Sequence, residues 1–122
     1  GCTEINDQTR ELMRQLAMEY QLDIVPSDRG FERLPPWQGK QYDAEEKEER
    51  LITILENLKP GKYLSVTHPA YLTPETERVF HIGYENVGAD RHGETMTLTS
   101  ERVKSTIQKL GIVVIGYHEV GR

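Results

Sequence analysis

The sequence is poor in cysteine, in clustered positive charge and in long apolar runs, and each shortage excludes a class of protein. Cys2 is the single cysteine among 122 residues, so neither an internal disulfide nor a cysteine-based zinc site can form. The formal net charge is -5 and lysine and arginine do not cluster, which argues against binding to nucleic acid or to an anionic membrane. No apolar run approaches the roughly 20 residues that span a bilayer.

The common catalytic and nucleotide-binding motifs are absent as well. The chain has no GxGxxG, Walker A, GxSxG or HExxH motif, so none of the corresponding sites is expected. Its histidines show no HxH or HxxxH spacing, and no local zinc site is therefore expected. They are His68, His81, His92 and His118. No signal peptide is visible, and we interpret the chain as cytosolic, as already processed or as a portion of a longer protein.

Apolar spacing predicts helices along the whole chain. Residues 6–21 carry apolar side chains at four-residue intervals, which is typical of an amphipathic helix. Residues 43–58 show the same pattern, and Asp43 with Glu46 form a capping-box-like pair at its start. We interpret the acidic run of this helix as its solvated face. Two further helices are expected, one beginning at Thr73 and one capped by Thr99 or Ser100.

Three short apolar runs predict strands between these helices, over residues 22–25, 63–67 and 112–117. Because helices and strands alternate, we expect parallel strands joined by right-handed crossovers. The predicted fold class is α/β in a single domain over residues 1–122. A sheet of about three strands leaves edges uncovered, so we expect a partial (β/α) barrel-like fragment that self-associates.

Two loops without apolar periodicity are predicted, over residues 27–42 and 80–96. Long loops in compact domains are often functional. The first loop contains Phe31 and Trp37, and exposed aromatic side chains on a loop suit stacking against sugars. The alternative is that both side chains fold back over the core.

His68 is the strongest candidate for chemistry because it follows the predicted strand over residues 63–67. In parallel α/β folds, active sites collect at the C-terminal ends of strands. An imidazole there can act as a general acid or base near neutral pH, or bind a metal. Pro69 biases His68 toward extended geometry. The alternative is a histidine that merely begins a loop.

Two stretches of the sequence resemble the YdjC-like carbohydrate deacetylases, the chitooligosaccharide deacetylase family. The first, LKPGKYLSVTHPAY over residues 58–71, is similar to the family's PG turn, strand and HPGY or HPAY ending. The second, over residues 90–120, resembles the family's C-terminal end and includes Arg91 and Glu94. LMRQLAMEYQLDIV also resembles a helix and strand of that family.

This resemblance implies a (β/α) barrel that hydrolyses the N-acetyl groups of amino-sugar oligosaccharides. It implies that His68 is a general acid or transition-state donor, and that Trp37 and Arg91 bind substrate. The family's zinc is held by an aspartate and two histidines of its N-terminal half, and the likeness covers only the C-terminal half. We therefore expect no cofactor in this chain itself, and zinc or another divalent metal only in the full-length family.

Three functional interpretations remain open at this point. The chain is the C-terminal portion of a metal-dependent deacetylase, inactive in isolation, or it is a non-catalytic module that binds carbohydrate or protein. In the third interpretation, it is a metal-independent enzyme that uses His68 together with Asp90 or Glu94. All three predict no nucleic-acid partner and no membrane span.

Overall fold

The computed structural model describes residues 6–22, 30–116 and 119. The chain forms two compact units, one comprising Gly1–Leu34 with Pro60–Ser65 and the other Pro35–Lys59 with Val66–Arg122. Four α-helices and two parallel strands lie within the described residues, a helix-rich arrangement compatible with a small α/β fold. None of these helices combines the length and the apolar character that a membrane span needs.

In the first unit, α1 spans Asp7–Tyr20, which confirms the helix predicted over residues 6–21. Asn6 caps its start, because Asn6 Oδ1 accepts a hydrogen bond from Thr9 N at 2.8 Å. The helix ends at Gln21, whose φ of 53° is the left-handed conformation common at helix C-termini.

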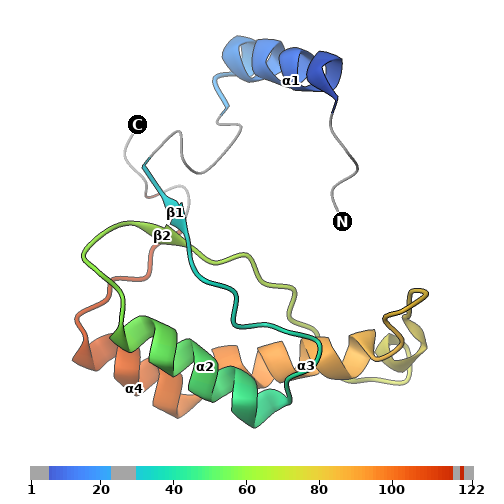
Figure 1. Ribbon diagram of the computed structural model, residues 1–122, viewed down its shortest axis with the longest axis vertical. Helices are drawn as coiled ribbons and strands as arrows, with labels where there is room; N and C mark the ends of the chain where they lie inside the picture. The colour runs from blue at the N-terminus through green and yellow to red at the C-terminus, as the bar shows by residue number, and fades with distance from the viewer. Residues whose placement is uncertain (1–5, 23–29, 117–118, 120–122) are drawn as a thin grey trace. The chain divides into compact units, whose positions relative to one another are not determined.

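The sheet of the first unit consists of β1 (Glu32–Arg33) and β2 (Tyr63–Leu64), which lie side by side in Figure 1. The two strands are parallel, as alternation of helices and strands predicts. Glu32 pairs with Tyr63, and Glu32 N donates to Lys62 O at 2.9 Å. β2 occupies the first part of the strand predicted over residues 63–67. Across residues 6–22, 30–116 and 119, the structure shows a small open sheet and no barrel.

Two sequence predictions about strands need correction. β1 lies inside the loop predicted over residues 27–42, because two consecutive charged residues give no apolar alternation by which a strand could be recognised. The strand predicted over residues 112–117 is absent from its described part, residues 112–116, where Val113 is 79% exposed. An apolar run forms a strand only when a neighbouring strand hydrogen-bonds to its backbone amides. Neither β1 nor β2 pairs with residues 112–116. Residues 23–25 of the first predicted strand lie outside the described residues.

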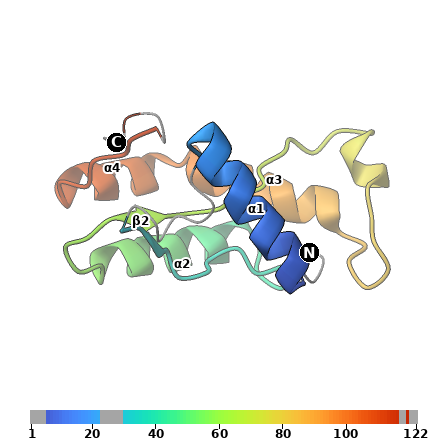
Figure 2. The ribbon, with the colours of Figure 1, turned by 90° about the horizontal axis from the view of Figure 1, so that it is seen from above.

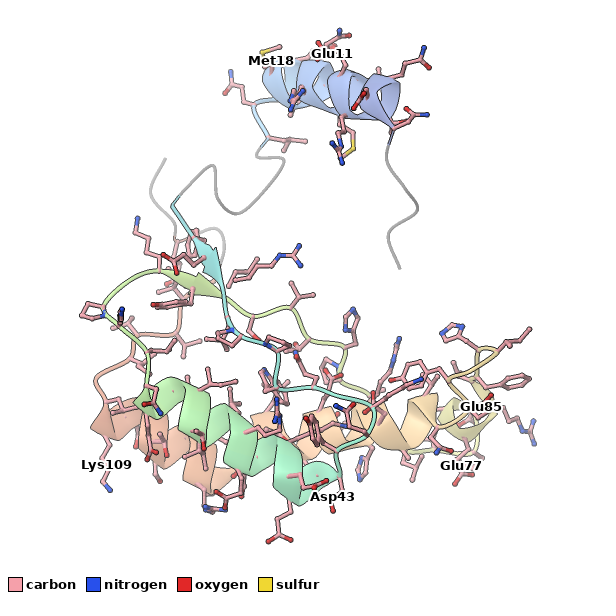
Figure 3. All side chains as sticks on the ribbon, viewed as in Figure 1. Glu11, Met18, Asp43, Glu77, Glu85 and Lys109 are labelled. Carbon is pink, nitrogen blue, oxygen red and sulfur yellow. The ribbon has the colours of Figure 1, made fainter. Side chains whose placement is uncertain are left out.

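The second unit is built on α2 (Ala44–Glu56), with α3 (Val87–Leu98) and α4 (Glu101–Lys109) following one another beside it (Figures 1 and 2). The capping box predicted for α2 is confirmed, since Asp43 Oδ1 accepts from Glu46 N at 2.9 Å and Glu46 Oε2 accepts from Asp43 N at 3.0 Å. Figure 3 shows Asp43 at the start of α2 and Lys109 at the end of α4. The apolar core of the unit is formed by Trp37, Leu51, Ile52, Leu55, Val87 and Val103.

The other two predicted helices differ in outcome. α4 begins where predicted, because Ser100 Oγ accepts from Arg102 N at 3.1 Å and from Val103 N at 3.4 Å. The helix predicted from Thr73 is only a 3-10 turn, η2 (Thr76–Arg78). Thr73 and Thr76 satisfy each other's backbone N–H groups with their hydroxyls, which stabilises the turn without extending it.

The position of α3 corrects the prediction of a loop over residues 80–96. Two features hide this helix from the sequence. Its glycines permit close contact: a Cβ at Gly88 would lie 2.6 Å from Thr76 O, and one at Gly93 would lie 3.2 Å from Lys47 Nζ. Its buried side chains are largely polar, so no apolar stripe repeats along it.

A buried ion pair joins α2 to α3. Lys47 is 1% exposed, and its Nζ contacts the Asp90 carboxylate as well as Asp90 O, the latter at 3.0 Å. Desolvating two charges is costly, so such a pair is sustained only when both members are hydrogen-bonded. Removing one partner leaves the other charge uncompensated in the interior.

We predict that Lys47→Met lowers the free energy of unfolding by about 3–5 kcal/mol, because the Asp90 carboxylate loses its buried cation. Chemical denaturation measures this loss. As a control, Lys104→Met removes an exposed pair with Glu101 and should cost at most about 1 kcal/mol. Adding Asp90→Leu to Lys47→Met should recover part of the loss. Equal effects of the two lysine variants would contradict a stabilising role for the buried pair.

We also predict that Gly88→Ala destabilises the fold by about 1–3 kcal/mol, although alanine is the better helix former, because its Cβ overlaps the backbone of Thr76. Gly93→Ala is the matched comparison. Its Cβ would lie 3.2 Å from Lys47 Nζ, a milder overlap than the 2.6 Å between a Gly88 Cβ and Thr76 O, so the loss should be smaller. Thermal and denaturant unfolding of the two variants would decide, and a more stable Gly88→Ala protein would refute the close approach.

Candidate functional site

His68 lies in the second unit, in the HPAYL segment (residues 68–72), which contains no helix or strand. Its backbone N–H donates to Glu94 Oε2 at 2.7 Å, and the residue is exposed. Pro69, which follows, restricts His68 to extended conformations and has no N–H of its own. The backbone of His68 is thus constrained from two sides while the residue stays accessible to solvent.

Three further hydrogen bonds hold the HPAYL segment along α3. Ala70 N donates to Arg91 O at 3.3 Å, and Ala70 O accepts from Thr95 Oγ1 at 2.9 Å. Leu72 N donates to His92 Nδ1 at 3.4 Å, so His92 serves here as an acceptor. Consecutive turns of one helix therefore bind alternate residues of the segment.

Glu94 is the charged member of this arrangement. Its side chain is buried, with 4% of the residue exposed, and it accepts the N–H of His68. Hydrogen bonds to an ionised carboxylate are shorter and stronger than those between neutral groups. A carboxylate is costly to bury without such a donor, so the bond stabilises Glu94 as well as the segment that it holds.

Arg91 lies on the same helix and is half-buried. Its carbonyl belongs to the contact with Ala70 described above. Among the described residues, its guanidinium makes no hydrogen bond or ion pair, and its positive charge partly offsets the rise in the pKa of Tyr84. The predicted substrate-binding role of Arg91 stays a prediction.

Trp37 is 1% exposed and belongs to the core of the second unit. This is the alternative in which the loop aromatics fold back, and Phe31 is buried in the first unit as well. Stacking on a sugar would require Trp37 to leave its present position. The loop of Trp37 nevertheless adjoins the chain leading to His68, because Gln38 Nε2 donates to Val66 O at 2.6 Å.

A second polar group, missed by the sequence analysis, surrounds Asp90. The Tyr84 hydroxyl donates to the Asp90 carboxylate, which also receives Lys47. Burial, followed by the hydrogen bond to Asp90 and the charge of that carboxylate, raises the pKa of Tyr84 to about 12. One signal could have revealed the group: Lys47 stands four residues before Leu51, on the apolar stripe of its helix, where a charge needs a partner.

These contacts bear on the metal-independent interpretation. The Asp90 carboxylate is bound by Lys47 and Tyr84, and Glu94 contacts the backbone N–H of His68. The structure therefore shows no acid paired with the imidazole of His68 among the described residues. His81 is exposed and pairs through its backbone with Tyr84, and His118 lies outside the described residues.

The described residues do not provide the set of zinc ligands that the predicted resemblance implies for the full-length family. Among the residues described, no group of three or more histidine, cysteine, aspartate or glutamate side chains could hold a metal ion. Comparisons with family models, with curated proteins and with solved structures gave no match for the chain.

The raised pKa of Tyr84 predicts a pH dependence above pH 10. A folded-state pKa above the ordinary value of 10.0 means that the stability contributed by the neutral phenol is fully present below pH 10 and is lost as the pH rises to about 12. Tyr84→Phe should lack this loss. An absorbance titration of the tyrosines should also lose the ionisation step near pH 12 in this variant. Tyr71→Phe, which changes an exposed tyrosine, should retain that step; its retention in Tyr84→Phe would contradict the assignment.

Proposed function

We propose that this chain is the C-terminal portion of a metal-dependent, YdjC-like carbohydrate deacetylase that hydrolyses N-acetyl groups of amino sugars, and that it is inactive in isolation. One observation carries the proposal: His68 is exposed while its backbone is bound to a buried carboxylate of α3. An accessible imidazole on a constrained backbone is suited to proton transfer. The parallel pairing of β1 and β2 is compatible with a part of a (β/α) barrel.

In this proposal, His68 acts as the general acid. Once a water oxygen has bonded to the acetyl carbonyl carbon, the protonated imidazole gives its proton to the amide nitrogen as the carbon–nitrogen bond breaks, which releases acetic acid and the sugar as a neutral amine. Arg91 lies one turn before Glu94 on α3, where its guanidinium can bind a hydroxyl or carbonyl oxygen of the sugar. The metal-binding residues would come from other parts of the protein, and we assign no step to the metal.

A second candidate function is a non-catalytic module that binds carbohydrate. Tyr71, in the HPAYL segment, is 68% exposed, and aromatic side chains at accessible positions suit sugar stacking. Tyr71 is therefore accessible to a sugar, whereas Trp37 is buried. The binding module requires no metal ligands and no proton transfer by His68.

The decisive experiment measures acetate release from N-acetylglucosamine oligomers by a longer protein that contains this sequence together with the metal-binding segment. We predict that His68→Ala lowers kcat by about 10²- to 10⁴-fold, the range typical of a lost general acid, with the fold intact. His81→Ala, which changes another exposed histidine of the same unit, is the matched control and should retain most activity. His92→Ala should have a smaller effect than His68→Ala.

Near-full activity of the His68→Ala protein would refute the catalytic role of His68. Saturable binding of the oligomers without acetate release by the longer protein would instead support the binding module. In that case, Tyr71→Ala should weaken binding while His68→Ala leaves it unchanged.

A further inference from the structure

The four hydrogen bonds between α3 and the HPAYL segment divide into two kinds. Three of them join uncharged groups: Ala70 N donates to Arg91 O, Leu72 N donates to His92 Nδ1, and the Thr95 hydroxyl donates to Ala70 O. The fourth holds the backbone of His68 through the buried carboxylate of Glu94. The charged acceptor is thus placed at the residue to which the proposed function assigns proton transfer.

We propose that Glu94 is a positioning residue that fixes the His68 imidazole through the His68 backbone, an inference that rests on the proposed function of this site. Glu94 binds the N–H of His68, and Pro69 restricts the backbone on the other side. Together they define the direction in which the Cα–Cβ bond of His68 leaves the chain. Glu94 does not contact the ring by any hydrogen bond in the described structure.

The position of Glu94 on α3 explains why it can act as a fixed support. Asp90 stands one turn earlier on the same helix and is bound to Lys47 of α2. Thr97, less than one turn later, donates to Gly93 O at 3.0 Å and to Ala44 O at 3.4 Å. The helix is therefore attached to α2 on both sides of Glu94, and its carboxylate has little freedom to follow a displaced His68.

The consequence for a reaction is geometric. A misplacement of a catalytic group by about 1 Å can cost about 10²-fold in rate, although no group that touches the substrate has been removed. We expect Glu94→Ala in the longer protein to lower kcat by roughly 10- to 100-fold while KM changes by about 2-fold or less. Glu94→Gln keeps an acceptor in place and should restore most of kcat, since a neutral hydrogen bond retains about half the strength of a charge-assisted one.

The same inference is tested on the 122-residue chain without any activity. Amide hydrogen exchange measured by NMR should be roughly 10- to 100-fold faster at His68 in Glu94→Ala than in the unchanged chain, because a hydrogen bond to a charged group is lost. Exchange at Leu72 should change little, because its bond to His92 is retained. In Glu94→Gln, the His68 amide proton should shift upfield, as its acceptor is no longer charged.

Glu77→Gln and Glu77→Ala are the matched controls. Glu77 lies in η2 of the same unit, as Figure 3 shows, and it is exposed. Both changes should leave the exchange at His68 and the kinetics unaltered. If Glu94→Ala proves unfolded by circular dichroism, Glu94→Gln decides through the His68 amide shift and through kcat.

The outcomes separate this inference from the proposed function. Unchanged exchange and an unchanged amide shift at His68 in the Glu94 variants would overturn the positioning role, whether or not the longer protein is a deacetylase. An active longer protein with full kcat in Glu94→Ala would overturn it too, and would leave the proposed function standing. A lower kcat in Glu94→Ala, accompanied by an equal rise in KM, would assign Glu94 to substrate binding instead.

Discussion

The second unit depends on the buried contact between Lys47 and Asp90, because this ion pair fixes how α3 lies against α2. Two desolvated charges tolerate little displacement, since separating them exposes each to an interior that cannot solvate it. Tyr84 adds a third member by donating to the same carboxylate. Gly93 lets Lys47 approach the helix closely enough for the pair to form. The rotation of α3 about its own axis is thereby restricted.

That restriction determines where the candidate site lies. Once Asp90 is directed toward α2, the spacing of the helix directs Glu94, one turn later, toward the backbone of His68. Arg91 and Thr95, which bind Ala70, are four residues apart and lie on one side of the helix. Ion pairing in the interior and support of the HPAYL segment are thus two consequences of one helix orientation.

The sequence predicted best those elements whose signals are local. Capping by Asp43 and Ser100 rests on side chains that bind amides two or three residues away, and both caps are present. The backbone constraint on His68 by Pro69 is equally local. α3 was not predicted because its residues are chosen for contacts with other parts of the chain. Gly88 leaves room for the backbone of Thr76, and Asp90 pairs with Lys47. These long-range contacts produce no periodic pattern of apolar residues within the segment.

Trp37 was harder to place from the sequence than His68, for a physical reason. A bulky aromatic side chain in a loop gains free energy equally by covering a core or by meeting a ligand, so composition cannot separate the two. A buried glutamate is different, because its carboxylate must find a donor wherever it lies. Glu94 could therefore have been recognised from its helix once the orientation of that helix was known. Polar residues that interrupt an apolar pattern hide a helix from prediction, and in α3 they are also the residues that support the candidate site.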